Sequence, residues 1–373
     1  MIQISRPYYN SEEIEAINKE ISKCLENGIL VNGPNLKIFE NLFSSYHGVE
    51  YAIGVNSGSS ALELCIKALE IEGSEIITTN NTCVSVPNSI ANAGCLPVLA
   101  DIKKETLALD PVALKKQITK KTKALVLVHM EGTIQEDVDQ VIEICKKYNL
   151  FVIEDACRAL GSKKGNKLAG TFGDLSFFSF YATKTISTGN GGMILTPNSL
   201  YSDKLKILRS HGRVKVHNHY SYDVFGNNMI MGEIEAILGI NQLKNLDNKI
   251  VHRNNIAKKY DKALANLSNI AFAIDYSIDI VNSYYRYPII ISLDKDSSQF
   301  ESLFTSSKIN LGHYYPMISQ TKLYSSQSGS NRGNLEVSER ISRHIFSLPI
   351  HNDLSSDDVK RIINKMQDID KII

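Results

Sequence analysis

Short apolar runs and longer amphipathic stretches alternate through the first part of the chain. The short runs are mostly apolar, which is typical of strands buried in a sheet. The stretches between them repeat apolar residues every three or four positions, as helices with one buried face do. The predicted strands are Tyr51–Val55, Glu75–Thr79, Pro97–Ala100, Lys123–His129 and Phe151–Asp155, and the predicted helices are Ser59–Leu69, Ser85–Ala93, Asp110–Ile118 and Gln135–Tyr148. This alternation predicts a largely parallel sheet with helices on both faces.

The chain opens with the signature of a helix start. Asn10 is followed three positions later by Glu13, a pattern in which the two side chains cap each other's backbone N–H groups. Apolar residues then keep helical spacing until Asn27 and Gly28 end the run. An amphipathic first helix is therefore predicted.

The pattern of apolar positions changes around Asn269–Ser283, where it becomes strand-rich and mixed. Before this segment, helical stretches are predicted at Leu200–Ser210 and Glu233–Leu267. Beyond it we predict a strand at Tyr285–Leu293, a Ser-rich surface loop at Tyr324–Gly333 and a terminal helix at Asp357–Ile372, and we place the domain boundary near residue 245. We therefore predict a large α/β domain over residues 1–245 and a smaller α+β domain over residues 246–373.

Composition narrows the class of protein. The 373 residues are 43% hydrophobic and 22% charged, enough to bury a large core. The 41 basic and 40 acidic residues form no basic run, which argues against general nucleic-acid binding. No apolar run approaches the roughly 20 residues of a membrane span, and the N-terminus lacks a basic and apolar leader. The six cysteines show no Cys-x-x-Cys spacing, so neither a metal site nor a disulfide framework is expected. A reducing, cytoplasmic location is expected instead.

Lys184 follows the aromatic run Ser176–Tyr181 and stands in a loop of small residues. The amine is therefore expected at a strand end, where burial or a neighbouring cation can lower its pKa and let it condense with an aldehyde. Ser179 adds a hydroxyl that can hold an anion. The alternative is an ordinary lysine after an edge strand.

A second candidate is the turn Val55–Ala61, which follows a strand and opens a helix. Free backbone N–H groups at a helix start suit a phosphate, Gly58 lets the backbone approach closely, and Ser59 and Ser60 can add hydroxyl donors. An ordinary Ser-rich helix cap is the alternative.

A third candidate is the pair Glu154–Asp155, which ends an apolar strand at the sheet edge where α/β proteins build their sites. Such acids can also be helix caps or metal ligands. Together the three candidates fit one cofactor, pyridoxal 5′-phosphate (PLP), which needs an amine for its aldehyde, a carboxylate for its ring nitrogen and a cradle for its phosphate. Lys184, Asp155 and Gly58–Ser60 with Ser179 would supply these groups.

In their order and their amino-acid sequence, these motifs resemble those of the DegT/DnrJ/EryC1/StrS family of sugar aminotransferases, of fold type I. The resemblance covers nearly the whole chain and includes Gly33-Pro34, Asn56–Leu62, Gly94–Val98, Glu154–Ala156, Ser179–Lys184, Gly191-Gly192, Leu208–Gly212, Gly226–Asn228 and Leu348–Ile350. It implies a mostly parallel, seven-stranded sheet in the large domain.

The resemblance also implies roles for single residues. Lys184 would be the Schiff-base lysine and Asp155 the partner of the pyridine nitrogen, while Ser59, Ser60 and Ser179 would bind the phosphate. Asn228 would reach the phosphate in a neighbouring subunit, which implies a homodimer. Family members that dehydrate a sugar have histidine at the lysine position, so Lys184 favours amino transfer.

Several residues depart from the family pattern. Arg158 stands where the family mostly has Gln or His against the phenolic oxygen of the cofactor, and its alternative is to pair with an acid such as Glu154. Cys83 replaces the aromatic ring that usually stacks on the cofactor. Asn190, Ile230 and Ile318 replace an acid, an arginine and a histidine in segments that shape the substrate pocket.

Two further groups invite a role at the substrate. Arg209, His211, Arg213 and Lys215 could meet a substrate diphosphate or form a solvated basic turn. Tyr314 and Tyr315 could line the pocket or lie in the core.

The resulting hypothesis is a ping-pong aminotransferase that takes the amino group from L-glutamate and gives it to a keto sugar. The favoured acceptor is a nucleotide-linked 3- or 4-keto-6-deoxy sugar. Alternatives are a free keto sugar, a keto sugar acid or a cyclitol ketone, and, in a different class, a PLP-binding regulatory protein without turnover.

Overall fold

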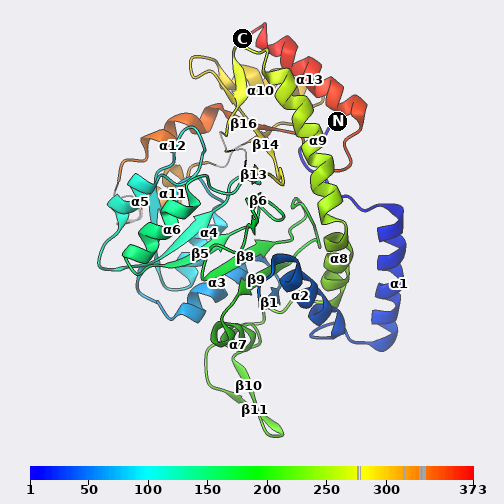
Figure 1. Cartoon of the computed structure of the whole chain (residues 1–373), viewed down its shortest axis with the longest axis vertical. Coiled ribbons are helices and arrows are strands. Elements are labelled where there is room, and N and C mark those ends of the chain that lie inside the picture. The colour runs from blue at the N-terminus through cyan, green and yellow to red at the C-terminus, as the bar shows by residue number, and fades with distance from the viewer. Residues whose placement is uncertain (275–276, 278, 314–315, 327–328, 330–332) are drawn as a thin grey trace.

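A seven-stranded sheet forms the centre of the computed structural model, which describes residues 1–274, 277, 279–313, 316–326, 329 and 333–373 (Figure 1). Its strand order is β1-β9-β8-β5-β4-β2-β3, and all neighbouring pairs are parallel except those of β9, which runs antiparallel to β1 and β8. The strands are β1 (Tyr51–Val55), β2 (Glu75–Thr79), β3 (Leu96–Ala100), β4 (Thr122–Val128), β5 (Phe151–Asp155), β8 (Leu175–Ser179) and β9 (Gly192–Thr196). The mostly parallel, seven-stranded sheet is confirmed.

Both faces of this sheet are buried, because successive residues of a strand point to opposite sides. In β4, Val126 packs in one apolar cluster, whereas Leu125 and Leu127 pack in another. The first cluster is covered by α3 (Gly58–Leu69), α4 (Ser85–Asn92) and α7 (Ser199–Leu208), and the second by α2 (Pro34–His47), α5 (Pro111–Gln117), α6 (Val138–Lys147) and α8 (Glu233–Lys244). This double cover explains why the central strands show near-continuous apolar runs.

The first helix, α1 (Ser11–Asn27), has the predicted boundaries. Asn10 and Glu13 form the reciprocal capping box, and Gly28 ends the helix in the left-handed conformation. The helix packs against α8 through Ile17, Cys24 and Ile237.

Two helical features differ from the sequence prediction. The helix α2 was not predicted, although Pro34 at its start and Gly48 just past its end are the usual punctuation. The stretch Glu233–Leu267 is two helices, α8 and α9 (Leu246–Leu264), which meet at Asn245.

A smaller antiparallel sheet lies beyond α9, at the top of Figure 1. Its order is β12 (Ile270–Phe272), β14 (Tyr287–Ile291), β16 (Ile345–Leu348) and β15 (Gly312–His313). Its core is shared with α9, α10 (Ser297–Ser306) and α13 (Ser356–Asp370). The predicted strand near Tyr285–Leu293 and the predicted terminal helix are thus confirmed as β14 and α13.

The domain boundary near residue 245 stays a prediction. Within α9, Ile250 packs with the cluster of the large sheet, whereas Ile256 packs with the smaller sheet. The segment between β15 and β16 returns to the large sheet at the carboxyl end of β2, where Asn80 Nδ2 donates to Ser338 Oγ at 2.8 Å. This segment holds η1 (Ile318–Gln320), α11 (Lys322–Ser325), α12 (Glu336–Ile341) and η2 (Ser342–His344).

Part of the predicted surface loop at Tyr324–Gly333 lies outside the described residues. Its first residue, Tyr324, is buried and belongs to α11, and its hydroxyl donates to Asn88 Oδ1 at 2.6 Å. The loop prediction is therefore wrong at its start, because an apolar cluster with Leu99 holds the tyrosine ring.

Two small sheets complete the fold. The hairpin β10 (Arg213–Val216) and β11 (His219–Tyr222) projects from the body of the molecule (Figure 1). The strands β6 (Lys163–Lys164), β7 (Lys167–Leu168) and β13 (Ile280–Val281) form the other. Across the described ranges, no helix is both long and apolar enough to cross a membrane.

Candidate active site

A cavity of about 330 Å³ opens at the carboxyl ends of β5 and β8. This is the edge at which open α/β sheets bind ligands, and the volume is near the lower end for small-molecule sites. The cavity brings together most of the predicted site residues: Gly58, Ser59, Cys83, Asp155, Arg158, Ser179 and Lys184. Ser60 and Asn228 do not line it.

Lys184 lies in the loop between β8 and β9, which we call the lysine loop (residues 181–189). The Lys184 N–H donates to the Tyr181 carbonyl, and the Thr188 N–H donates to the carbonyl of Phe180, the residue just before the loop, both at 2.9 Å. The Lys184 amine lies 4.8 Å from the centre of the Tyr285 ring, within cation–π range. The loop backbone and an aromatic face therefore hold the amine at the cavity.

Asp155 and Glu154 point to opposite sides of β5 because strand side chains alternate. Asp155 lines the cavity, and its Oδ1 accepts a hydrogen bond from the Cys157 N–H at 3.0 Å. Glu154 is fully buried, and its Oε1 lies 2.7 Å from His129 Nε2. His129 Nδ1 accepts from the Gln135 N–H, so Nε2 carries the hydrogen and donates to Glu154. The carboxylate of Glu154 is thus occupied by hydrogen bonds within the protein, and Asp155 is the carboxylate available to a ligand.

The start of α3, where the phosphate cradle is predicted, lies on this cavity. A Cβ at Gly58 would lie 2.9 Å from Ser179 Cβ, so only glycine lets α3 begin this close to β8. The first backbone N–H groups of a helix carry partial positive charge and lack intrahelical partners. With the hydroxyls of Ser59 and Ser179 on the same cavity, this arrangement fits a phosphate. Ser60 instead places its hydroxyl 2.9 Å from that of Ser57, the cap of α3.

Arg158 lines the cavity and is paired with an acid. Its Nη1 lies 2.8 Å from Glu131 Oε1, and both side chains are buried. The sequence alternative was an acid such as Glu154, but that carboxylate is bonded to His129. The acid is therefore Glu131, and the guanidinium still faces the site, 5.5 Å from the Tyr285 ring.

Tyr285 is a site residue that the sequence reasoning missed. It is 3% exposed, lines the cavity, and its hydroxyl lies 3.1 Å from that of Thr183, the neighbour of Lys184. Burial raises the pKa of the phenol, but the positive charges of Lys184, Arg158 and Arg286 outweigh it, so the pKa lies below its usual 10.0. The sequence offers no signal for this role, because Tyr285 reads only as the start of a strand.

The other departures from the family pattern occupy different places. Cys83 and Asn190 line the cavity, as expected for residues that shape a pocket. Ile230 lies outside it and pairs with Val55 in a backbone bridge. Ile318 is 1% exposed and packs with Leu99, so a core position accounts for it.

Asn228 is exposed; its carbonyl accepts from Asn56 Nδ2 at 3.4 Å, and its backbone pairs with Ser210 in a bridge. In the basic cluster, Arg209 is buried with its Nη1 2.6 Å from both Glu40 and the Gly54 carbonyl, so it is a structural residue. Lys215 lies in the projecting hairpin and is exposed. Tyr314 and Tyr315 lie outside the described residues.

Comparisons with known proteins agree with this geometry. A family model described as the DegT/DnrJ/EryC1/StrS aminotransferase family matches residues 11–367. The chain is 34% identical to the spore coat polysaccharide biosynthesis protein SpsC of Bacillus subtilis (98% of this chain, 96% of the relative). It is 32% identical to GDP-perosamine synthase of Escherichia coli O157:H7 (96% and 95%). The structure of Helicobacter pylori PseC, an aminotransferase involved in the biosynthesis of pseudoaminic acid, matches with a TM-score of 0.91 and 29% identity over 100% of both chains.

Proposed function

The chain belongs to the DegT/DnrJ/EryC1/StrS aminotransferase family, and on that premise we propose that it moves an amino group from L-glutamate to a nucleotide-linked 3- or 4-keto-6-deoxy sugar. The observation that carries this proposal is the convergence of Lys184, Asp155 and the start of α3 on one cavity. These groups lie in different elements, and an amine, a carboxylate and a phosphate cradle are what a single cofactor requires.

The cofactor of this family is PLP, and the residues of the cavity fit it. Lys184 would hold its aldehyde carbon, Asp155 its ring nitrogen, and Gly58, Ser59 and Ser179 its phosphate. When bound, PLP carries the amino group between the two substrates and withdraws electrons from the bond that breaks.

The chain itself moves the protons. We propose that Lys184 Nζ takes the proton from the α-carbon of glutamate in the first half reaction. In the second half reaction it delivers a proton to the carbon that was the ketone of the sugar. The lysine loop and the Tyr285 ring keep the amine at the cavity during both steps.

The nucleotide-linked acceptor is supported by the likeness to GDP-perosamine synthase. A free keto sugar, a keto sugar acid or a cyclitol ketone is the second candidate, because Ile230 stands where the family usually has an arginine. A screen of purified keto compounds in the second half reaction separates the two.

We also propose a homodimer in which Asn228 completes the site of the partner. Asn228 is exposed and does not line the cavity of its own chain. The hairpin just before it exposes large apolar side chains, and Phe225 is 100% exposed. A second copy of the chain would cover this surface, as exposed apolar patches commonly require.

A cytoplasmic location is the last part of the proposal. All six cysteines are free, including buried Cys24, Cys65, Cys95 and Cys145. Unbridged cysteines suit a reducing compartment.

The proposed reaction predicts that the yellow absorbance of the PLP-loaded protein falls when L-glutamate is added, with release of 2-oxoglutarate, and returns when the correct keto sugar is added. Lys184→Ala should abolish both changes and still bind PLP, because the cradle is intact. Lys206→Ala, which removes an exposed lysine on α7, should behave as the unmodified protein. Turnover by Lys184→Ala, or no response to any amino acid, would contradict the proposal; the second result favours a PLP-binding regulatory protein.

A further inference from the structure

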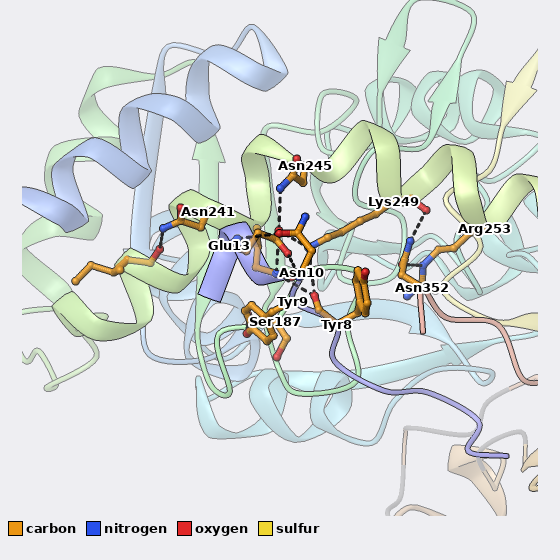
Figure 2. Close-up of polar contacts among 12 residues, drawn as sticks. Tyr8, Tyr9, Asn10, Glu13, Ser187, Asn241, Asn245, Lys249, Arg253 and Asn352 are labelled. Atoms are coloured by element: carbon orange, nitrogen blue, oxygen red, sulfur yellow. Dashed lines mark hydrogen bonds and ion pairs between the residues drawn. The ribbon is translucent and has the colours of Figure 1, made fainter. Parts of the chain in front are cut away.

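The segment before α1 reaches across the molecule to the lysine loop. The Tyr9 hydroxyl donates to the Ser187 carbonyl at 2.6 Å (Figure 2). Ser187 stands three residues after Lys184 and is 2% exposed. A buried carbonyl of this kind needs a donor, and Tyr9 provides one from a point 178 residues away in the sequence.

Tyr9 is suited to donate at any physiological pH. Its side chain is half-buried, and burial raises the pKa of the phenol above its usual 10.0. The hydroxyl therefore keeps its hydrogen.

A buried ion pair fixes the backbone that carries Tyr9. Glu13 Oε2 accepts from the Asn10 N–H at 2.8 Å, while Glu13 Oε1 accepts from Lys249 Nζ at 3.0 Å. The side chains of Glu13 and Lys249 are 3% and 6% exposed. Gln242 Nε2 also donates to the Tyr8 carbonyl at 3.1 Å. As Figure 2 shows, these contacts converge from α1, α8 and α9 on residues 8–13, so Tyr9 has little freedom to move.

The helix α9, which carries Lys249, also restrains the other end of the lysine loop. Arg253, one turn after Lys249 on α9, donates through Nη1 to the Tyr284 carbonyl at 2.8 Å and to the Ile350 carbonyl at 3.1 Å. This fixes the chain at Tyr285, whose hydroxyl lies 3.1 Å from that of Thr183. The lysine loop is thus held at Thr183 by one contact and at Ser187 by the other, on either side of Lys184.

We propose that Tyr9 is a positioning residue for Lys184. By holding the Ser187 carbonyl, its hydroxyl keeps the lysine loop in one conformation, so the amine returns to the same place in each half reaction. The inference rests on the proposed function for its catalytic consequence. Its structural part, the restraint of the lysine loop, is independent of any activity.

Tyr9→Phe tests the inference by removing a single oxygen atom. In the cofactor-free protein, amide hydrogen exchange of residues 181–189 should become several-fold faster, because the carbonyl loses its restraint. In the loaded enzyme, kcat should fall roughly ten- to a hundredfold, as misplacement of a catalytic group does, with KM for glutamate within about twofold. Tyr46→Phe is the matched control: it removes a half-buried hydroxyl bonded to Asp247 at 2.9 Å, and should change neither quantity.

Unchanged exchange of residues 181–189 in Tyr9→Phe overturns the inference, whatever happens to kcat. If Tyr9→Phe does not fold, Lys249→Gln replaces it, and faster exchange of the same residues is again required. If the unmodified protein has no aminotransferase activity, the proposed function is wrong. The hydrogen-exchange result still tests whether Tyr9 restrains the lysine loop.

Discussion

Tyr285 derives its chemical character from groups that are distant in the sequence. The Lys184 amine lies 4.8 Å from its ring, and the guanidinium carbons of Arg158 and Arg286 lie 5.5 Å from it. These charges lower the pKa of the phenol although the residue is buried. A residue of this kind cannot be recognised from its sequence neighbours, because its role comes from the fold.

His47 gives a pH dependence that belongs to a single side chain. It is buried against Phe43 and Phe178, and burial lowers its pKa from 6.5 to about 4. Between these values the unfolded chain binds a proton that the folded protein does not, so stability falls as the pH drops from 6.5 towards 4.

We expect the unfolding free energy to decrease by about 2 kcal/mol from pH 7 to pH 4.5 through His47 alone, since one pKa unit corresponds to about 1.4 kcal/mol. In His47→Leu this part of the decrease should disappear, whereas exposed His219→Gln should retain it. Urea unfolding at the two pH values measures the difference. Equal pH dependence in the unmodified protein and His47→Leu would contradict the assignment.

At the scale of elements, the close approach of α3 to β8 shapes the proposed phosphate cradle. In Gly58→Ala the new methyl group would meet Ser179 Cβ at 2.9 Å and Cys157 Sγ at 3.5 Å. Because backbone must shift to relieve this, we expect stability to fall by about 1–3 kcal/mol. We also expect PLP to bind at least about tenfold more weakly, which corresponds to the loss of one good hydrogen bond. A PLP titration with a thermal unfolding curve measures both.

Gly239→Ala separates the two effects. Its methyl group would crowd the Phe39 ring at 2.5 Å, but the position is on α8 and does not line the cavity. It should cost stability and leave PLP affinity unchanged. A loss of affinity equal to that of Gly58→Ala would mean that general destabilisation, and not the cradle, explains the result.

The elements themselves were largely predictable. The strands of the large sheet were found because burial on both faces leaves an almost continuous apolar run. The helix α2 was missed, although Pro34 and Gly48 mark its ends. Both Ile38 and Leu42 on it are exposed, so its apolar residues do not form one clean stripe.

At the scale of the whole molecule, the proposed dimer makes a test of site sharing possible. If Asn228 completes the neighbouring site, Lys184→Ala and Asn228→Ala damage different halves of each site. A mixed dimer would then contain one intact site, with its lysine from one chain and its asparagine from the other. Random mixing should restore about a quarter of all sites, as expected for a symmetric dimer.

The two proteins are unfolded together and refolded, and aminotransferase activity at limiting PLP is measured before and after this treatment. As the control, each protein is refolded alone, and its activity should stay low. If the mixture never exceeds the average of the two controls, Asn228 does not act across the interface.

The sequence by itself predicted a PLP site and determined the architecture around it. Apolar periodicity specified the sheet, and Lys184, Asp155 and the Gly58 turn stood at strand ends, where α/β proteins gather ligand-binding groups. The apolar pattern of a strand and the residue types at its end are local properties, because burial and backbone geometry constrain each segment separately.

Only the tertiary structure decided which groups surround the amine. It paired Arg158 with Glu131, brought Tyr285 to Lys184, and joined Tyr9 to Ser187. The physical reason is that such contacts join residues far apart in the chain, so they depend on how helices and sheets pack and not on any local pattern of residues.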